Sequence, residues 1–361
     1  MTTTHDHRAD VLDEALDRLA GYSFTDGPGM ATHGPMGAEA FAGLGHDDDV
    51  ADWVEAYKAS HEPIPEPPAN ERLDLADAAS WQPALGDPSR LADWRDGFRR
   101  SLADEPWADV LRTWLPRLAP GYAGAFTHGL IRTAHAVRIV QLRPEPSAQG
   151  LAELATALAY WAGTYRALPG DAILRGTTSL ADALAQVPRP DQPWTPVEAG
   201  MFTRVGELDG FAESVGRLAP PAAIDQGLSE LTATLARLMI ARPDAMPFGL
   251  VHAVTPVAGV RTLLPYLDPG DHRLVYGYLW RVDAAIVAGF VPSPVDAATL
   301  APAGDDPPEM PTPPDLVTQA AEHRDPHVVK FTATCLSENA LAPDPAYLLA
   351  AQHVIHKTPP L

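Results

Sequence analysis

Apolar residues recur along this chain at spacings of three and four, which is the period of helices that bury one face. Segment 151–168 shows this spacing at Leu151, Leu154, Leu158, Trp161 and Tyr165. Segments 11–19, 48–60, 91–102 and 227–240 are also rich in strong helix formers. Sustained alternation of apolar and polar residues with β-branched enrichment, the strand pattern, does not occur. The sequence therefore predicts an all-α protein.

Prolines and glycines separate the predicted helices. The 38 prolines and 27 glycines cluster notably at 63–68, 188–196 and 292–314. We expect 292–314, which is rich in Pro, Asp and Ala, to be a long surface loop, either a connector or the approach to a lid. Histidines that could form a site lie on both sides of these segments. We therefore predict one large helical domain over 1–361, with 1–10 as a flexible N-terminus and a metal site between helices.

Charge and cysteine content exclude several classes of function. With 47 acidic and 26 basic residues the net charge is −21, which repels nucleic acid and anionic lipid, so we expect neither as a partner. Because Cys335 is the only cysteine, a disulfide within the chain and a cysteine-rich metal cluster are both excluded. The N-terminal segment lacks the pattern of a signal peptide, and no run of about 18 apolar residues follows. We expect a cytoplasmic protein of undetermined oligomeric state.

Some of the 13 histidines lie among apolar or small residues. These are His33, His128, His135, His252, His327, His353 and His356. A buried imidazole needs a partner, which is either a polar group of the core or a metal ion. Each histidine alone is more typical of a hydrogen-bonded core residue. Several of them on separate helices are typical of metal sites built from inward-facing side chains.

Lys330 is one of only three lysines, with Lys58 and Lys357. It follows His327 by three residues, so the two project from one face of a helix. A metal ion would repel an ammonium group, and the pair suits a metal site only if the lysine is neutral or modified. A neutral amine can add carbon dioxide to form a carbamate, which is an anionic oxygen ligand. A surface helix with an ordinary histidine and lysine fits the spacing equally well.

Four segments in this order carry a resemblance to a known family. They are Thr-His-Gly-Pro-Met at 32–36, the stretch 107–136 with His-Gly-Leu-Ile, His-Ala-Val-Thr within 250–255, and His-Val-Val-Lys within 325–330. With this order and spacing the chain resembles the questin oxidase family, helical enzymes that use oxygen in aromatic polyketide metabolism. The resemblance covers most of the chain.

The resemblance implies a non-haem iron dioxygenase whose Fe(II) is held by four histidines and a carboxylated lysine. The matching positions are His33, His128, His252, His327 and Lys330. Alternative ligands that remain open are His135, His353 and His356. Five protein ligands leave one position open on an octahedral ion. The implied reaction is an O2-dependent cleavage or oxygenation of a ring in a polycyclic, anthraquinone-like substrate.

Arg132 and His135 are the candidate catalytic residues outside the ligand set, at positions where the chain departs from the fungal pattern of the family. Arg132 would stabilise a phenolate or carboxylate that develops during the reaction, or it forms an ion pair with an acidic residue. For His135 the choice is between a part in the reaction and replacement of one metal ligand.

Two other functions remain open. One is an NADPH-assisted Baeyer-Villiger-type monooxygenase, which other members of the family resemble, but no Gly-x-Gly-x-x-Gly follows a predicted strand, so no residue is assigned to NADPH. The other is a non-catalytic protein that binds aromatic metabolites and keeps its histidines hydrogen-bonded in the core. A zinc hydrolase is disfavoured because no His-Glu-x-x-His helix is present.

Overall fold

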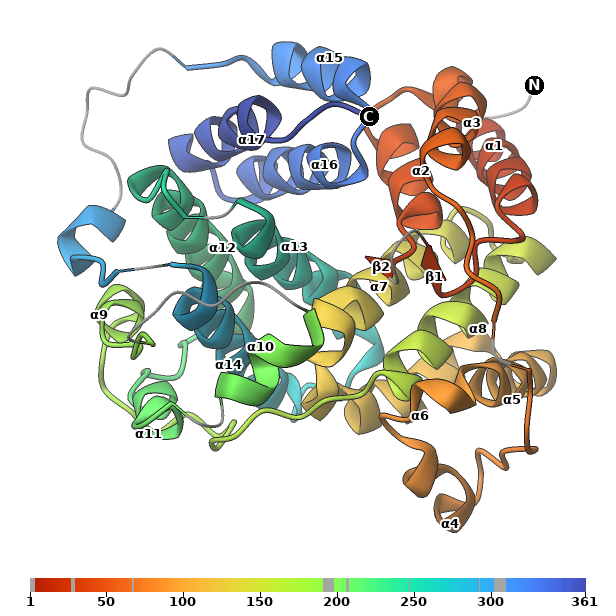
Figure 1. The fold of residues 1–361 in the computed structure, drawn as a ribbon, viewed down its shortest axis with the longest axis horizontal. Coiled ribbons are helices and arrows are strands. Elements are labelled where there is room, and N and C mark those ends of the chain that lie inside the picture. Colours follow the sequence, from red (N-terminus) through yellow and green to blue (C-terminus); the bar gives the residue numbers. More distant parts are fainter. Residues whose placement is uncertain are drawn as a thin grey trace. The chain divides into compact units, whose positions relative to one another are not determined.

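Helices make up nearly all of the regular structure in the computed structural model of the chain (Figure 1). The structure describes residues 4–26, 30–66, 68–190, 198–205, 208–245, 247–291, 293–301 and 310–361. Within those ranges the sheet structure is one antiparallel pair of short strands, β1 (Thr25–Asp26) and β2 (Met30–Ala31). The predicted all-α class is confirmed. Of the described helices, none has the length and apolar character that crossing a membrane requires.

The chain divides into two compact units, and the single domain expected from the sequence stays a prediction. Unit 1 comprises residues 1–166, 265–267 and 361, and unit 2 comprises 167–264 and 268–360. The helices of unit 1 are α1 (Thr4–Arg18), α2 (Gly34–Gly43), α3 (Val50–Ser60), α4 (Ala78–Trp81), α5 (Leu91–Asp104), α6 (Trp107–Leu118), α7 (His128–Val140) and α8 (Ala148–Gly163). Those of unit 2 are α9 (Leu180–Ala185), α10 (Glu198–Val205), α11 (Phe211–Val215), α12 (Ile224–Ala241), α13 (Pro247–Leu263), α14 (His272–Phe290), α15 (Pro313–His323), α16 (Pro326–Leu341) and α17 (Pro345–Lys357). Short 3-10 helices occupy Asp47–Asp49, Gln82–Ala84, Pro88–Arg90, Ala119–Gly121, Gly124–Thr127, Leu264–Tyr266 and Ala297–Leu300.

The core of unit 1 forms where α8 packs against α5 and α7. Helix α7 is buried along nearly its whole length, including its polar residues His128, Arg132 and His135. Gly129 brings α7 close to α8, because a Cβ atom there would lie 2.7 Å from the Cα of Trp161. Helix α2 packs on the other helices α1, α3 and α7. A buried helix of this kind presents its side chains to neighbours on every side.

The N-terminal helix begins earlier than the sequence suggested. Helix α1 starts at Thr4, so residues 4–10, predicted to be flexible, are helical, and residues 1–3 lie outside the described part. From residue 9 on, this helix buries an apolar stripe of Ala9, Leu12 and Ala15. The structure therefore assigns a helix to residues 4–10, and the flexibility expected of the terminus stays a prediction.

In unit 2, α12 packs against α13 and α17, and α16 packs against α13, α15 and α17. Figure 1 shows α15, α16 and α17 side by side. The loop predicted at 292–314 ends two residues earlier than expected. Thr312 caps α15, and Pro313 occupies the first turn of that helix. Leu300, in the short helix Ala297–Leu300, is buried. Residues 292 and 302–309 of this segment lie outside the described residues.

Candidate metal centre

Unit 1 contains a pair of buried histidines, His33 at the N-terminal boundary of α2 and His128 as the first residue of α7. Their Nε2 atoms are 3.0 Å apart and their rings meet at 84°. Either one ring donates a hydrogen bond to the other, or both lone pairs face one cation. Two nitrogens bound at right angles to one ion, each about 2.1 Å from it, are separated by about 3.0 Å. The spacing suits two ligands of the same ion.

The backbone before His128 is unusual. Three successive residues, Ala125, Phe126 and Thr127, have left-handed conformations, with φ angles of 45°, 55° and 69°. Such conformations are costly for residues other than glycine and cluster at functional sites. They turn the Ala125 carbonyl toward the imidazole, 2.6 Å from Nδ1 of His128. Since a carbonyl only accepts, Nδ1 carries the hydrogen, and Nε2 presents its lone pair toward His33.

A buried network holds the backbone of His33. The Tyr57 hydroxyl accepts a hydrogen bond of 2.8 Å from the His33 N–H and donates one to the carboxylate of Asp26. Burial, followed by the negative charge of Asp26, raises the pKa of Tyr57 well above its ordinary value, so it remains a neutral donor. Tyr57 and Asp26 were not predicted from the sequence. No local pattern joins two residues that meet only through folding.

Unit 2 contains a second pair, His252 on α13 and His327 on α16. The ring centroids are 5.4 Å apart at an angle of 65°. Nδ1 of His252 lies 2.7 Å from the Phe248 carbonyl, which again assigns the hydrogen to Nδ1 and the lone pair to Nε2. The Phe248 ring contacts both imidazoles, at centroid distances of 4.5 and 5.2 Å. An aromatic surface thus borders the pair.

Asp325 orients His327. Its carboxylate caps α16 by accepting from the backbone N–H groups of His327 and Val328, at 2.8 and 3.2 Å. One oxygen also lies 3.5 Å from Nδ1 of His327. Burial alone would raise the pKa of Asp325, but the interactions with His327 lower it, so the group is ionised. A carboxylate on the far nitrogen of a histidine is the usual support of a metal ligand. The Asp-x-His spacing at the start of a helix is the sequence signal that points to Asp325.

Lys330 is buried on α16, one turn after His327. Its amine makes no hydrogen bond or ion pair with any residue that the structure describes. Burial lowers its pKa from 10.5 to about 7, against a weaker opposing effect of Asp325. A substantial fraction of Lys330 is therefore a neutral amine near neutral pH.

Arg132 and His135, the candidate catalytic residues, both contact a carboxylate inside unit 1. Nε and Nη2 of the buried Arg132 donate to Glu153 at 2.6 and 2.8 Å, and Nη1 donates to the Ser23 carbonyl. The ion pair that the sequence left open as an alternative role of Arg132 is therefore present. Nδ1 of His135 lies 2.6 Å from the carboxylate of Glu39 on α2. The Glu39 contact links α2 to α7, the two helices that carry His33 and His128.

Four histidines, two in each unit, are the candidate metal donors among the described residues: His33, His128, His252 and His327. Of the alternatives named from sequence, His135 lies on α7 and contacts Glu39, and the other two lie on α17, where His356 is exposed and His353 is half-buried. Burial and the nearby positive charge of Lys357 lower the pKa of His353.

Comparison with known proteins identifies the family. The sequence profile of the questin oxidase-like family matches residues 45–335, a span that contains His128, His252, His327 and Lys330 and begins after His33. No curated protein matches the chain. The family name indicates an oxidase that acts on aromatic polyketides, and hence an oxidoreductase. The chain belongs to the questin oxidase-like family.

Proposed function

We propose that the protein is an O2-dependent oxidoreductase, a non-haem iron dioxygenase that cleaves or oxygenates a ring of a polycyclic, anthraquinone-like polyketide. The partners in this proposal are the aromatic molecule and O2. The observation that carries it is a close histidine pair in each unit, of which only His327 is partly exposed. The proposal joins both pairs and Lys330 in one site for Fe(II).

The donor set suits a metal ion for two reasons. His128, His252 and His327 each direct Nδ1 toward a carbonyl or carboxylate oxygen, which orients Nε2 as the donor atom. The 3.0 Å spacing of the Nε2 atoms of His33 and His128 equals that of adjacent ligands on an octahedral ion. Imidazole nitrogen with an anionic oxygen suits Fe(II), and five such ligands leave one position open.

Lys330 would supply the anionic oxygen. Its neutral amine forms an N–C bond with carbon dioxide and releases one proton to water, which leaves a carbamate monoanion. Burial favours this step because it destabilises the ammonium form, as the lowered pKa of about 7 indicates. Lys330 lies one turn from His327, so both side chains project from the same face of α16.

The other residues bind, orient and exclude water. When bound, Fe(II) would supply the activation of dioxygen next to an electron-rich aromatic ring. Phe248 offers an aromatic surface beside His252 for a planar substrate to stack on. We assign Arg132 and His135 positioning roles, since their contacts with Glu153 and Glu39 hold α7 against α8 and α2.

Iron content measured on single-histidine variants tests the proposal. Protein purified without chelators should contain near-stoichiometric iron and consume oxygen with a hydroxyanthraquinone, and chelation should abolish both. If one ion uses both pairs, His128→Ala and His252→Ala, one from each unit, should each lose nearly all the iron. His356→Ala, which changes an exposed histidine, is the control.

Two results would contradict the proposal. Oxygen uptake that persists after complete removal of metal would exclude an iron enzyme. Iron retained at full occupancy in either His128→Ala or His252→Ala would exclude a shared ion. A protein that binds the anthraquinone without consuming oxygen would instead be the non-catalytic binding protein considered from the sequence.

The NADPH-assisted monooxygenase has less support. A dinucleotide site of the usual kind needs a parallel strand-helix-strand unit. The part of the chain that the structure describes contains one antiparallel pair of two-residue strands. The same oxygen assay run with and without NADPH distinguishes this function.

A further inference from the structure

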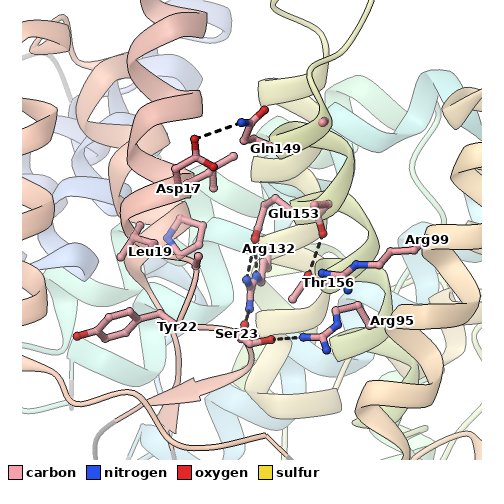
Figure 2. A pocket seen from close by; sticks show the side chains of 15 residues that line it. Asp17, Leu19, Tyr22, Ser23, Arg95, Arg99, Arg132, Gln149, Glu153 and Thr156 are labelled. Atoms are coloured by element: carbon pink, nitrogen blue, oxygen red, sulfur yellow. Dashed lines mark hydrogen bonds and ion pairs between the residues drawn. The ribbon is translucent and has the colours of Figure 1, made fainter. Parts of the chain in front are cut away.

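Unit 1 contains a cavity of about 350 Å³ that the proposed reaction does not use. Helices α1, α5, α7 and α8 supply its walls (Figure 2). This volume lies within the range of pockets that hold small ligands. Figure 2 shows the side chains of Arg95, Arg99 and Arg132 gathered around the cavity.

The lining of this cavity contains more guanidinium groups than carboxylates. Three guanidinium groups line it, against two carboxylates, Asp17 and Glu153, in a protein of net charge −21. Glu153 is already paired with Arg132, and Asp17 accepts a hydrogen bond of 3.2 Å from Gln149. Arg95 is paired with Glu66, which lies outside the lining, so the guanidinium without a close carboxylate partner is that of Arg99.

Arg95 and Arg99 retain hydrogen-bond donors for a ligand. Arg95 binds Ser23 and Glu66 through Nη1, while its buried Nε has no partner among the described residues. Arg99 makes no hydrogen bond to the described residues, and its nearest carboxylate, that of Asp96, is 3.8 Å away. The two arginines are four residues apart on α5, so they share one helix face. Neither guanidinium can lose its proton at physiological pH.

The rest of the lining indicates the ligand. Leu16, Leu19, Tyr22 and Pro35 form an apolar part of the wall. We infer that this cavity binds a small aromatic carboxylate, with the ring against the apolar wall and the carboxylate between Arg95 and Arg99. The planar guanidinium fork matches a carboxylate in geometry and charge. The ligand would contact the same two helices that carry His33 and His128, because Pro35 lies on α2 and Arg132 on α7.

Calorimetric titration of the full chain with benzoate tests the inference. We expect benzoate to bind. Benzamide, which has the same shape without the charge, should bind with an affinity at least about tenfold lower. Arg99→Gln should weaken benzoate binding by a similar factor of about ten. The matched control is Arg112→Gln on α6, because Arg112 is exposed, lies outside the cavity and contacts Asp109 three residues before it, as Arg99 contacts Asp96.

A second variant tests the cavity itself. Ala152 lines the wall, and Ala152→Phe should fill the space and abolish binding while both arginines remain. Circular dichroism should show that each variant keeps the helical content of the wild type. The inference is overturned if benzoate does not bind at millimolar concentration, if Arg99→Gln or Ala152→Phe binds it as the wild type does, or if benzamide or inorganic phosphate binds equally well.

Discussion

Replacing Lys330 by methionine should stabilise the metal-free protein. Methionine has a similar length and shape, so it fills the same space without the amine. Burial lowers the pKa of Lys330 from 10.5 to about 7, which means that the folded chain binds this proton less tightly than the unfolded chain. Between the two pKa values, protonation of Lys330 favours the unfolded state, so the free energy of unfolding rises with pH.

The magnitude follows from the same two pKa values. At pH 8 the unfolded chain is protonated at Lys330 and the folded chain is mostly neutral, which costs the folded state about 3 kcal/mol, at about 1.4 kcal/mol per pH unit. At pH 10 the cost falls to about 1 kcal/mol. Lys330→Met should therefore raise the free energy of unfolding by these amounts, and the gain should shrink as the pH rises.

Urea unfolding in chelator and carbon dioxide-free buffer measures this gain. The control is Lys357→Met, which makes the same change at an exposed position near the end of α17. The reasoning is refuted if Lys330→Met is no more stable than Lys357→Met at pH 8, or if its gain is the same at pH 8 and pH 10. Either result would mean that the buried amine keeps an ordinary pKa.

Three further substitutions test the supporting interactions. Glu153→Gln should lower the free energy of unfolding by about 3 to 5 kcal/mol, because it leaves a buried guanidinium unpaired, and a loss below about 1 kcal/mol in urea would argue against that ion pair. Asp325→Asn keeps the helix cap but removes the carboxylate beside His327, so iron affinity in chelator competition should fall about 10- to 100-fold; unchanged affinity would exclude the orienting role. Tyr57→Phe should cost about 1 to 3 kcal/mol, since the His33 N–H loses its acceptor, and an unaltered thermal midpoint would contradict this.

Local patterns determined the helices of this protein, although not all of their ends. The predicted segment 91–102 corresponds to α5 (Leu91–Asp104), and 227–240 lies within α12 (Ile224–Ala241). The segment 151–168 was placed too far along, because α8 (Ala148–Gly163) starts at a serine cap and ends before Tyr165. Beyond the end of α8, the Tyr165 ring packs over Gly121. This contact with a residue distant in sequence is not visible to a local helix pattern.

The family, and the choice of five candidate ligands, could also be predicted from the sequence, because short motifs keep their order along the chain. The orientation of each candidate ligand was decided only by the tertiary structure. The tautomer of His128 depends on three left-handed residues before it, the backbone of His33 on Tyr57, and the lowered pKa of Lys330 on complete burial. The physical reason is the separation in sequence between the residues that interact. Helix periodicity is a property of neighbouring residues, whereas desolvation and side-chain hydrogen bonds depend on which distant segments surround a group after folding.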